Sequence, residues 1–331
     1  MAQMKYFYEL TISSSPHAHS PVTTQTIMRD VLIALTPALI GSICFFGFRA
    51  LMVTLVSAAA CVFFEWGWCR LRKIPNKTYD LSAVVTGVLL AFVCPVTIPY
   101  WTIILGDLFA IILVKMLFGG LGKNIVNPAL AGRAFMFSWP VLMSNWVKVG
   151  FSNSAGLLST ADAVTAATPM AAMHQGVLPD EPVSALFLGN VGGCIGETSA
   201  LLLLIGFAYL LYRKVITARI PVAFIGTVAV LTFLFPQGND RIAWMTSQVF
   251  GGGLMLGAIF MATDYVTSPL TRLGQIVYGI GCGVITVLIR YFGGYSEGVS
   301  YAILCMNCCV VLLDKLGRPV KFGAPKKEAA K

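Results

Sequence analysis

Charged residues are scarce in this sequence. Asp, Glu, Lys and Arg make up 11% of the 331 residues, whereas 57% are apolar. Soluble domains carry about a quarter charged residues, so this deficit excludes an ordinary soluble protein and predicts a polytopic membrane protein. The net charge is +9, but Lys and Arg in such a protein mark cytoplasmic loops. We therefore expect lipid contacts and no nucleic-acid partner.

A signal peptide and a disulfide framework are also lacking. Residues 1–28 contain no apolar core and no cleavage site, and predict a cytoplasmic N-terminal arm. The nine cysteines lie mostly in apolar runs and predict reduced, buried thiols. The stretch "CMNCC" (305–309) has no second cysteine pair at a matching spacing, so an iron–sulfur cluster is not expected. His17 and His19 are interpreted as polar loop residues.

Long apolar runs are what the sequence does have. A spanning helix needs roughly 20 mostly apolar residues, and we expect an all-α membrane domain of about ten such helices over residues 29–314. A basic cytoplasmic tail follows at 315–331. Pro95 stops the third span, and glycines interrupt the sixth and eighth. The expected spans lie near residues 31–48, 51–69, 81–94, 98–118, 126–144, 186–212, 219–236, 250–266, 274–293 and 297–314.

The positive charges predict the orientation of these spans. Eighteen of the 23 Lys and Arg residues lie near the termini or at the exits of even-numbered spans, which places both termini in the cytoplasm. The loop 145–185 then lies outside the cytoplasm. Ten spans divide into five plus five, which predicts an inverted repeat with broken helices near a central site. The alternative is that glycine is simply common in membrane helices.

Carboxylates stand in or beside the apolar runs, where charge is costly and points to function. Asp80, Glu197 and Asp264 are candidates for an ion pathway. The alternative for Asp80 and Glu197 is capping, because each stands before a helical run. The full set of such carboxylates is Glu65, Asp80, Asp107, Glu197 and Asp264.

A second polar cluster lies in "GGLGKNIVNPALAGRAF" (119–135). Asn124 and Asn127 are three residues apart, which predicts that they share one helix face. Two amides can donate and accept at the edge of a polar ring such as an isoalloxazine. Hydrogen bonding between helices is the alternative.

The stretch "DAVTAATPM" (162–170) stands in the expected outer loop. Its small residues would leave hydroxyls accessible to a modifying enzyme. The local sequence by itself favours a helix start, with Thr168 as the N-cap and Pro169 as the first helical residue.

Many motifs in one order resemble a known family, the D subunits of Rnf electron-transport complexes. That family is related to the B subunits of sodium-translocating NADH:quinone reductases, and the short N-terminal arm favours the Rnf subunits. The resemblance covers nearly the whole chain. It rests on "SSSPHAHS", "IMRDVLIALTPALI", "DLSAVVTGVLLAF", "GLGKNIVNPALAGRAF", "DAVTAATPM", "GCIGETSALLLL", "MATDYVTSPLTRLG" and "FGGYSEGVSYAILCMN".

The resemblance implies two flavins. The family esterifies FMN through its phosphate to the last threonine of Asp-x-x-Ser/Thr-Gly/Ala-Ala-Thr, which matches Asp162, Thr165 and the acceptor Thr168. A separate flavin transferase using FAD would attach it, and the phosphate would lie at a helix N-terminus. Non-covalent riboflavin would bind at Asn124 and Asn127. Asp80 and Asp264 fall near carboxylates that the related reductase uses in ion uptake.

The expected function follows from this resemblance. The protein would be a flavoprotein subunit in the inner (cytoplasmic) membrane of a bacterium, assembled with the A, B, C, E and G subunits of an Rnf complex. It would relay electrons between ferredoxin and NAD+ while the complex moves Na+ or H+. Two other classes stay open on the residues alone: a passive channel or transporter for a small polar solute, and a structural anchor for partner subunits.

Overall fold

The protein is all-helical in the computed structural model, which describes residues 22–75, 78–143, 145–146, 168–179 and 181–317. Within these ranges no strand forms, which agrees with the predicted class. The N-terminal half contains α2 (Thr24–Phe46), α3 (Phe48–Leu71), η1 (Thr78–Asp80), α4 (Ser82–Phe92), α5 (Tyr100–Leu108), η2 (Phe109–Met116), α6 (Pro128–Met136) and α7 (Pro140–Met143).

The C-terminal half follows with helices of similar lengths. It contains α8 (Pro169–His174), α9 (Val183–Leu188), α10 (Ala200–Tyr212), α11 (Arg219–Leu234), α12 (Arg241–Phe250), α13 (Leu254–Leu256), η3 (Gly257–Met261), α14 (Arg272–Phe292) and α15 (Val299–Leu313). Both η2 and η3 are π-helices that continue a preceding α-helix.

Among the residues that the structure describes, three helices, α2, α3 and α14, are long and apolar enough to cross a membrane. A fourth span results if α12 and the α13–η3 helix, which meet at a bend of 59°, are counted together. The helices α4, α10, α11 and α15 are apolar but shorter. The membrane class is therefore supported, while the ten spans and the inverted repeat stay predictions.

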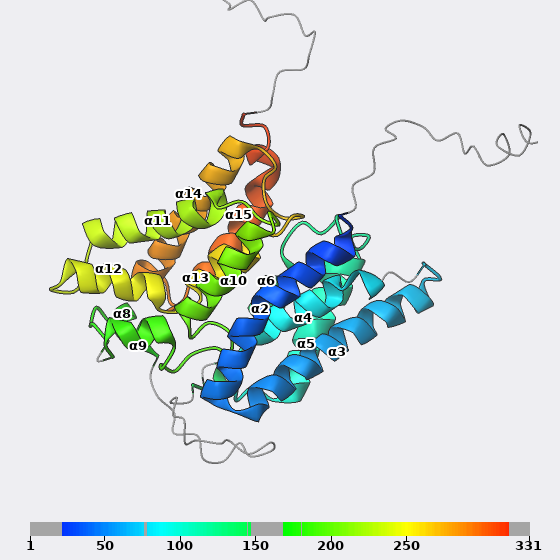
Figure 1. Ribbon diagram of the computed structural model, residues 1–331, viewed down its shortest axis with the longest axis horizontal. Coiled ribbons are helices and arrows are strands. Elements are labelled where there is room, and N and C mark those ends of the chain that lie inside the picture. The colour runs from blue at the N-terminus through cyan, green and yellow to red at the C-terminus, as the bar shows by residue number, and fades with distance from the viewer. Residues whose placement is uncertain (1–21, 76–77, 144, 147–167, 180, 318–331) are drawn as a thin grey trace, which may run out of the picture.

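The helices form two groups that lie side by side (Figure 1). In the first group α3 packs against α4 and α5, and in the second α11 packs against α12 and α14. The helices α2 and α10 pack together between the groups. The start of α2 and the end of α15 lie at one end of the molecule, and α8 and α9 lie at the other (Figure 1). We call these the terminal end and the loop end.

Three expected spans differ from the structure. The fifth, 126–144, forms two short helices, α6 and α7. The sixth, 186–212, is not one helix, because residues 189–199 are non-helical between α9 and α10. Gly189 has a φ of 102°, a conformation that glycine adopts without strain. The eighth, expected at 250–266, begins earlier as α12 and bends at Gly251–Gly253. A polar start, "DRIAWMTSQ", concealed α12 from a search for apolar runs.

Backbone hydrogen bonds join the two groups where their helices are broken. The α4 helix ends at Phe92, three residues before Pro95, as the sequence predicts. The carbonyl oxygens of Phe92 and Cys94 accept hydrogen bonds from the N–H groups of Gly196 and Ile195 at 2.9 and 3.0 Å, respectively. Each non-helical segment thus satisfies polar groups of the other, which a membrane interior requires.

Gly87 sets how closely α3 and α4 approach. A Cβ at Gly87 would lie 2.7 Å from the Cα of Ala58 and 2.8 Å from the carbonyl oxygen of Ser57. Because both contacts are backbone, Gly87→Ala is expected to lower the free energy of unfolding by about 1–3 kcal/mol. The control Gly67→Ala lies in α3 with nothing within 4 Å of the new Cβ, and alanine favours a helix by about 0.5–1 kcal/mol. Thermal melting of the purified protein measures both, and equal melting temperatures would contradict this account of the contact.

Candidate functional site

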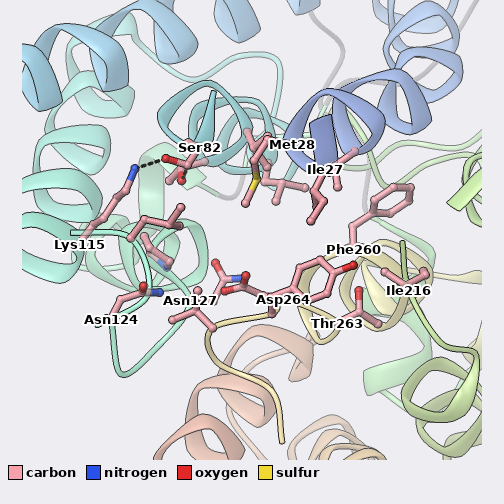
Figure 2. A pocket seen from close by; sticks show the side chains of 18 of the residues that line it. Ile27, Met28, Ser82, Lys115, Asn124, Asn127, Ile216, Phe260, Thr263 and Asp264 are labelled. Atoms are coloured by element: carbon pink, nitrogen blue, oxygen red, sulfur yellow. Dashed lines mark hydrogen bonds between the residues drawn. The ribbon is translucent and has the colours of Figure 1, made fainter. Parts of the chain in front are cut away.

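A pocket of about 740 Å³ opens between the two groups of helices. It lies toward the terminal end, because the first turns of α2 and the last residues of α10 and η2 contribute to its wall. We call it the inner pocket. Figure 2 shows Lys115 and Ser82 at one end of it and Ile216 and Phe260 at the other. Its lining is formed by Ile27, Met28, Val31, Ser82, Val85, Thr86, Leu89, Lys115, Leu121, Asn124, Asn127, Pro128, Leu210, Ile216, Phe260, Thr263, Asp264, Tyr265 and Val266.

Both predicted asparagines line the inner pocket, but not from a shared helix face. Asn127 is the N-cap of α6, and Pro128 is the first helical residue, so Asn124 precedes the helix. The Oδ1 of Asn127 accepts from the N–H of Ala129 at 3.0 Å, and its Nδ2 donates to the carbonyl oxygen of Met261 at 3.2 Å. The helix-face prediction was therefore wrong because a proline fixes the start of α6.

Asn124 retains a free acceptor. Its Nδ2 donates to the carbonyl oxygen of Val126 at 3.3 Å. Its buried Oδ1 has no hydrogen-bond partner among the described residues. A buried amide oxygen without a partner costs free energy, so Asn124 is suited to accept from a group that enters the pocket.

A chain of four polar side chains leads from the inner pocket into the N-terminal group of helices. The Nζ of Lys115 donates to Glu65 Oε2 at 2.9 Å and to Ser82 Oγ at 2.6 Å. Ser82 Oγ donates to Asp80 Oδ1 at 2.6 Å. All four side chains are buried. We call Glu65, Lys115, Ser82 and Asp80 the lysine chain.

The lysine chain changes two sequence interpretations. Asp80 accepts from the first backbone N–H of α4, that of Ser82, at 2.9 Å. It therefore caps the helix and also lies where an ion-path residue was expected. Lys115 stands near the end of the fourth expected span, 98–118, but only 1% of its surface is exposed, so it does not lie in a solvated loop. Its place inside the apolar run "FAIILVKMLF" was the signal in the sequence.

Asp264 forms part of the wall of the inner pocket, next to Asn127 (Figure 2). Its Oδ2 accepts from Thr267 Oγ1 at 3.1 Å. Asp107 lies apart, in α5, where its Oδ1 accepts from Ser57 Oγ at 2.7 Å and Cys61 Sγ at 3.2 Å. Asp264 therefore faces the pocket, as an ion-path residue must, while Asp107 lies in the packing between α3 and α5.

A cluster of three buried charges and one partly buried charge lies toward the loop end. Arg133 of α6 donates to Glu197 Oε1 at 3.2 Å and to Glu297 Oε2 at 2.9 Å. Arg290 of α14 donates to the carbonyl oxygen of Gln248 at 2.6 Å. We call Arg133, Glu197, Arg290 and Glu297 the outer cluster. Its formal charge is zero, so it can be buried without a further ion.

Glycines allow Glu197 to approach the bend between α12 and α13. A Cβ at Gly253 would lie 2.4 Å from Glu197 Oε1, and Gly252 has a φ of 65°. The glycine run that the sequence marked as a helix break therefore also makes room for the carboxylate. Glu197 Oε2, Arg133 Nε and Arg290 Nε are buried and have no hydrogen-bond partner among the described residues.

Thr168 lies beside the outer cluster. It is the N-cap of α8, its Oγ1 accepts from the N–H of Ala171 at 3.2 Å, and Pro169 is the first helical residue, as predicted. It shares a small pocket of about 330 Å³ with Cys194, Glu197 and Glu297. We call this the outer pocket.

The expected exposure of the threonine was wrong for Thr168, of which 6% is exposed. Pro169 and Met170 are buried next to it, and Met170 belongs to a small apolar cluster with Met173 and Trp244. Asp162 and Thr165, with His17 and His19, lie outside the described residues.

The cysteines agree with the sequence prediction of free thiols. All nine are free, and Cys61, Cys94, Cys194 and Cys282 are among the buried ones. The Cys194, Glu197 and Glu297 ligand atoms lie within 4.8 Å of one another. The guanidinium of Arg133 contacts all three side chains, and so already supplies the positive charge there.

Comparison with known proteins matches the chain to one family along almost its whole length. Residues 11–323 match the NQR2, RnfD, RnfE family. The chain belongs to this family. It is 46% identical to the D subunit of the Na+-translocating ferredoxin:NAD+ oxidoreductase complex of Acetobacterium woodii, over 97% of this chain and 98% of the relative. The predicted resemblance to the D subunits of Rnf complexes is confirmed.

Other relatives in the NQR2, RnfD, RnfE family differ in the ion that their names give. The D subunit of the proton-translocating complex of Clostridium ljungdahlii is 43% identical, over 95% of this chain and 96% of the relative. The D subunit of an ion-translocating oxidoreductase complex of Aeromonas salmonicida is 35% identical, over 96% and 99%. All three are subunits of ion-translocating oxidoreductases, which is the enzyme class that the sequence predicted.

For this family member, the structure brings the predicted residues together at two places. Asn124, Asn127 and Asp264 line the inner pocket, and Asp80 lies one hydrogen bond behind Ser82. Thr168 and Glu197 line the outer pocket. The sequence prediction missed Lys115, Arg133, Glu297 and Arg290 as members of these sites.

Proposed function

We propose that this chain is the D subunit of a ferredoxin:NAD+ oxidoreductase that moves Na+ or H+ across a bacterial cytoplasmic membrane. The observation that carries the proposal is the 46% identity to such a subunit over 97% of the chain. The A, B, C, E and G subunits of the Rnf complex are its partners. Both termini lie in the cytoplasm, in line with the basic residues near the ends of the sequence.

Thr168 carries FMN as a phosphoester in this proposal, attached by a flavin transferase that uses FAD. The motif ending at Thr168 supports it, as does the position of the threonine at the edge of the outer pocket. Glu197 lines this pocket, and its unpartnered Oε2 offers an acceptor to a polar group there. The flavin supplies one-electron transfer, while the chain sets its position and surroundings.

Riboflavin occupies the inner pocket in the same proposal. The pocket combines an apolar lining with a few polar side chains, which is typical of small-molecule sites. Apolar walls such as Leu89 and Phe260 suit the faces of a tricyclic ring. The free Oδ1 of Asn124 suits an N–H on its polar edge.

An inverted repeat with ten spans is part of the proposal. The broken helices α4 and α13–η3 are each followed by the same pattern, Val-Thr-x-Pro, at 96–99 and 266–269. Each broken helix also packs in an equivalent place, α4 beside α3 and η3 beside α11. Two related halves of opposite orientation would bring two such breaks to the middle of the membrane.

Ion transport in inverted membrane vesicles tests the proposed function. Vesicles that contain the complete complex are expected to take up ²²Na+ or protons when reduced ferredoxin and NAD+ are supplied. Vesicles that lack only this subunit should do neither. Because relatives are named for either ion, both are measured. Ion or solute flux that needs no electron donor would instead support the passive channel.

A further inference from the structure

Lys115 is a buried cation that the proposed electron-transfer role leaves unused. It lies on the π-helix η2, and 1% of its surface is exposed. Lysine in a membrane interior is costly and is a functional candidate by default. Stretches of π-helix occur often at functional sites. The position of this ammonium therefore calls for a role beyond holding helices together.

The negative charges of the carboxylates around Lys115 outnumber its single positive charge. Glu65 accepts directly from its ammonium, and Asp80 is linked to it through Ser82. Asp264 adds a third carboxylate in the wall of the same pocket. Asp30 of α2 is paired with Arg213, so it does not alter this balance. With one ammonium for three carboxylates, this end of the inner pocket attracts a further cation.

The oxygens that hold the ammonium form a ready set of ligands for a small cation. Glu65 Oε2 and Ser82 Oγ lie 2.9 and 2.6 Å from Nζ. Asp80 fixes the Ser82 hydroxyl, and Leu81 between them has a φ of 64°. Such a left-handed conformation is uncommon outside glycine, and here it brings the Asp80 carboxylate against the first turn of α4. Carboxylate and hydroxyl oxygens are the ligands that hard cations take.

The inner pocket gives the ammonium a second place to go. Lys115 and Ser82 both reach the pocket wall, where the carboxylate of Asp264 is also found (Figure 2). A lysine has three donors on a flexible four-carbon stem. Its ammonium can therefore leave Glu65 and remain hydrogen-bonded within the pocket.

We propose that Lys115 is an internal competitor for the transported cation. The ammonium and a cation that enters from the inner pocket alternate at the oxygens of Glu65 and Ser82. A sodium ion would bind these oxygens, and a proton would neutralise Glu65; either one replaces the positive charge of the ammonium there. The inference rests on the proposed ion translocation and assigns the exchange to one side chain of this protein.

The purified whole complex in proteoliposomes tests the exchange. Lys115→Met removes the competitor, so the half-saturating cation concentration is expected to fall about tenfold or more. The number of ions moved per NAD+ reduced should fall as well, because nothing displaces the bound cation. The sodium concentration is varied at fixed pH, and the pH is varied without sodium. The variants are then compared in the titration of whichever ion drives wild-type activity. Lys115→Arg keeps the positive charge, so its half-saturating concentration should lie between those of Lys115→Met and wild type.

A double variant separates exchange from a merely structural ion pair. Lys115→Met alone leaves Glu65 buried without its partner, which is expected to lower the yield of assembled complex. Lys115→Met with Glu65→Gln removes both charges and should restore assembly. If Lys115 only neutralises Glu65, the double variant also regains wild-type transport. We expect it to remain uncoupled, with ferredoxin oxidation no longer linked to ion uptake.

Three results would overturn the exchange. The first is an unchanged half-saturating concentration and ion yield in Lys115→Met. The second is restored coupling of electron transfer to ion uptake in the double variant. This result overturns the exchange even if the single variant does not assemble. The third is a wild-type complex that transfers electrons but moves neither Na+ nor H+. That last result appears without any substitution and identifies a failure of the proposed function itself.

Discussion

Thr168→Asn is expected to abolish the fluorescent flavin band of this protein on a denaturing gel. Asparagine keeps the N-cap acceptor that Thr168 supplies to Ala171, but it has no hydroxyl to esterify. This substitution therefore tests flavin attachment without loss of the helix cap. A change to valine would remove both. Expression with a flavin transferase, followed by gel fluorescence and the mass of the Thr168 peptide, measures the outcome.

Matched samples complete the flavin experiment. Thr168→Ser keeps both the cap and a hydroxyl, so it should retain a fluorescent band. Denaturation of the Thr168→Asn protein should still release non-covalent flavin if the inner pocket binds riboflavin. Electron transfer from ferredoxin to NAD+ should be lost in Thr168→Asn. An intact rate would favour a structural anchor, and a fluorescent Thr168→Asn band would place the attachment elsewhere.

Arg133→Met is expected to destabilise the protein by about 3–5 kcal/mol, because it leaves two buried carboxylates without their cation. The side chains of Arg133 and Glu197 are each 3% exposed, and Glu297 is 16% exposed. Removal of one partner from such a group costs more than the pair contributes when intact. Thermal melting of the detergent-purified protein, followed by size-exclusion chromatography, measures the effect.

The control for Arg133 is an ion pair in which only the arginine is open to solvent. Arg213 donates to Asp30 at 3.1 Å, but 46% of its side chain is exposed. The hydrogen bond and charge of Asp30 raise the pKa of Arg213, yet solvent reaches the arginine and Tyr209 still donates to Asp30 Oδ1 at 3.2 Å, so Arg213→Ala should lower the melting temperature less than Arg133→Met does. Arg133→Met combined with Glu197→Gln and Glu297→Gln should recover much of the loss. Equal melting of Arg133→Met and Arg213→Ala would contradict the importance of the outer cluster.

Local features of the fold were predictable because each depends on a short stretch of sequence. Scarce charge indicated the membrane class, Pro95 indicated the end of α4, and Thr168-Pro169 indicated the start of α8. The position of Asn124 was misread because Pro128 sets the start of α6, which outweighs the regular spacing of the two amides. A polar first turn likewise hid α12 from the hydropathy pattern.

The charged partners were not predictable from one sequence. Glu65 and Lys115 are 50 residues apart, and Arg133 is 64 residues from Glu197 and 164 from Glu297. No local pattern specifies which of several buried charges will meet, because the packing of distant helices decides it. The sequence therefore marked single carboxylates as ion-path candidates, while the structure shows that Glu197 contacts Arg133 and that Asp80 is linked to Lys115 through Ser82.

The hydrogen bonds between the two broken segments bear on how the chain is made. Phe92 and Cys94 accept from the N–H groups of Gly196 and Ile195, about a hundred residues later in the chain. A ribosome that has completed only the first group of helices has not yet produced these donors. The first half therefore enters the membrane with carbonyl oxygens beside Pro95 that have no hydrogen-bond donor, and lipid supplies none. Its maturation waits for the second half, so the two halves complete folding together rather than in the order of synthesis.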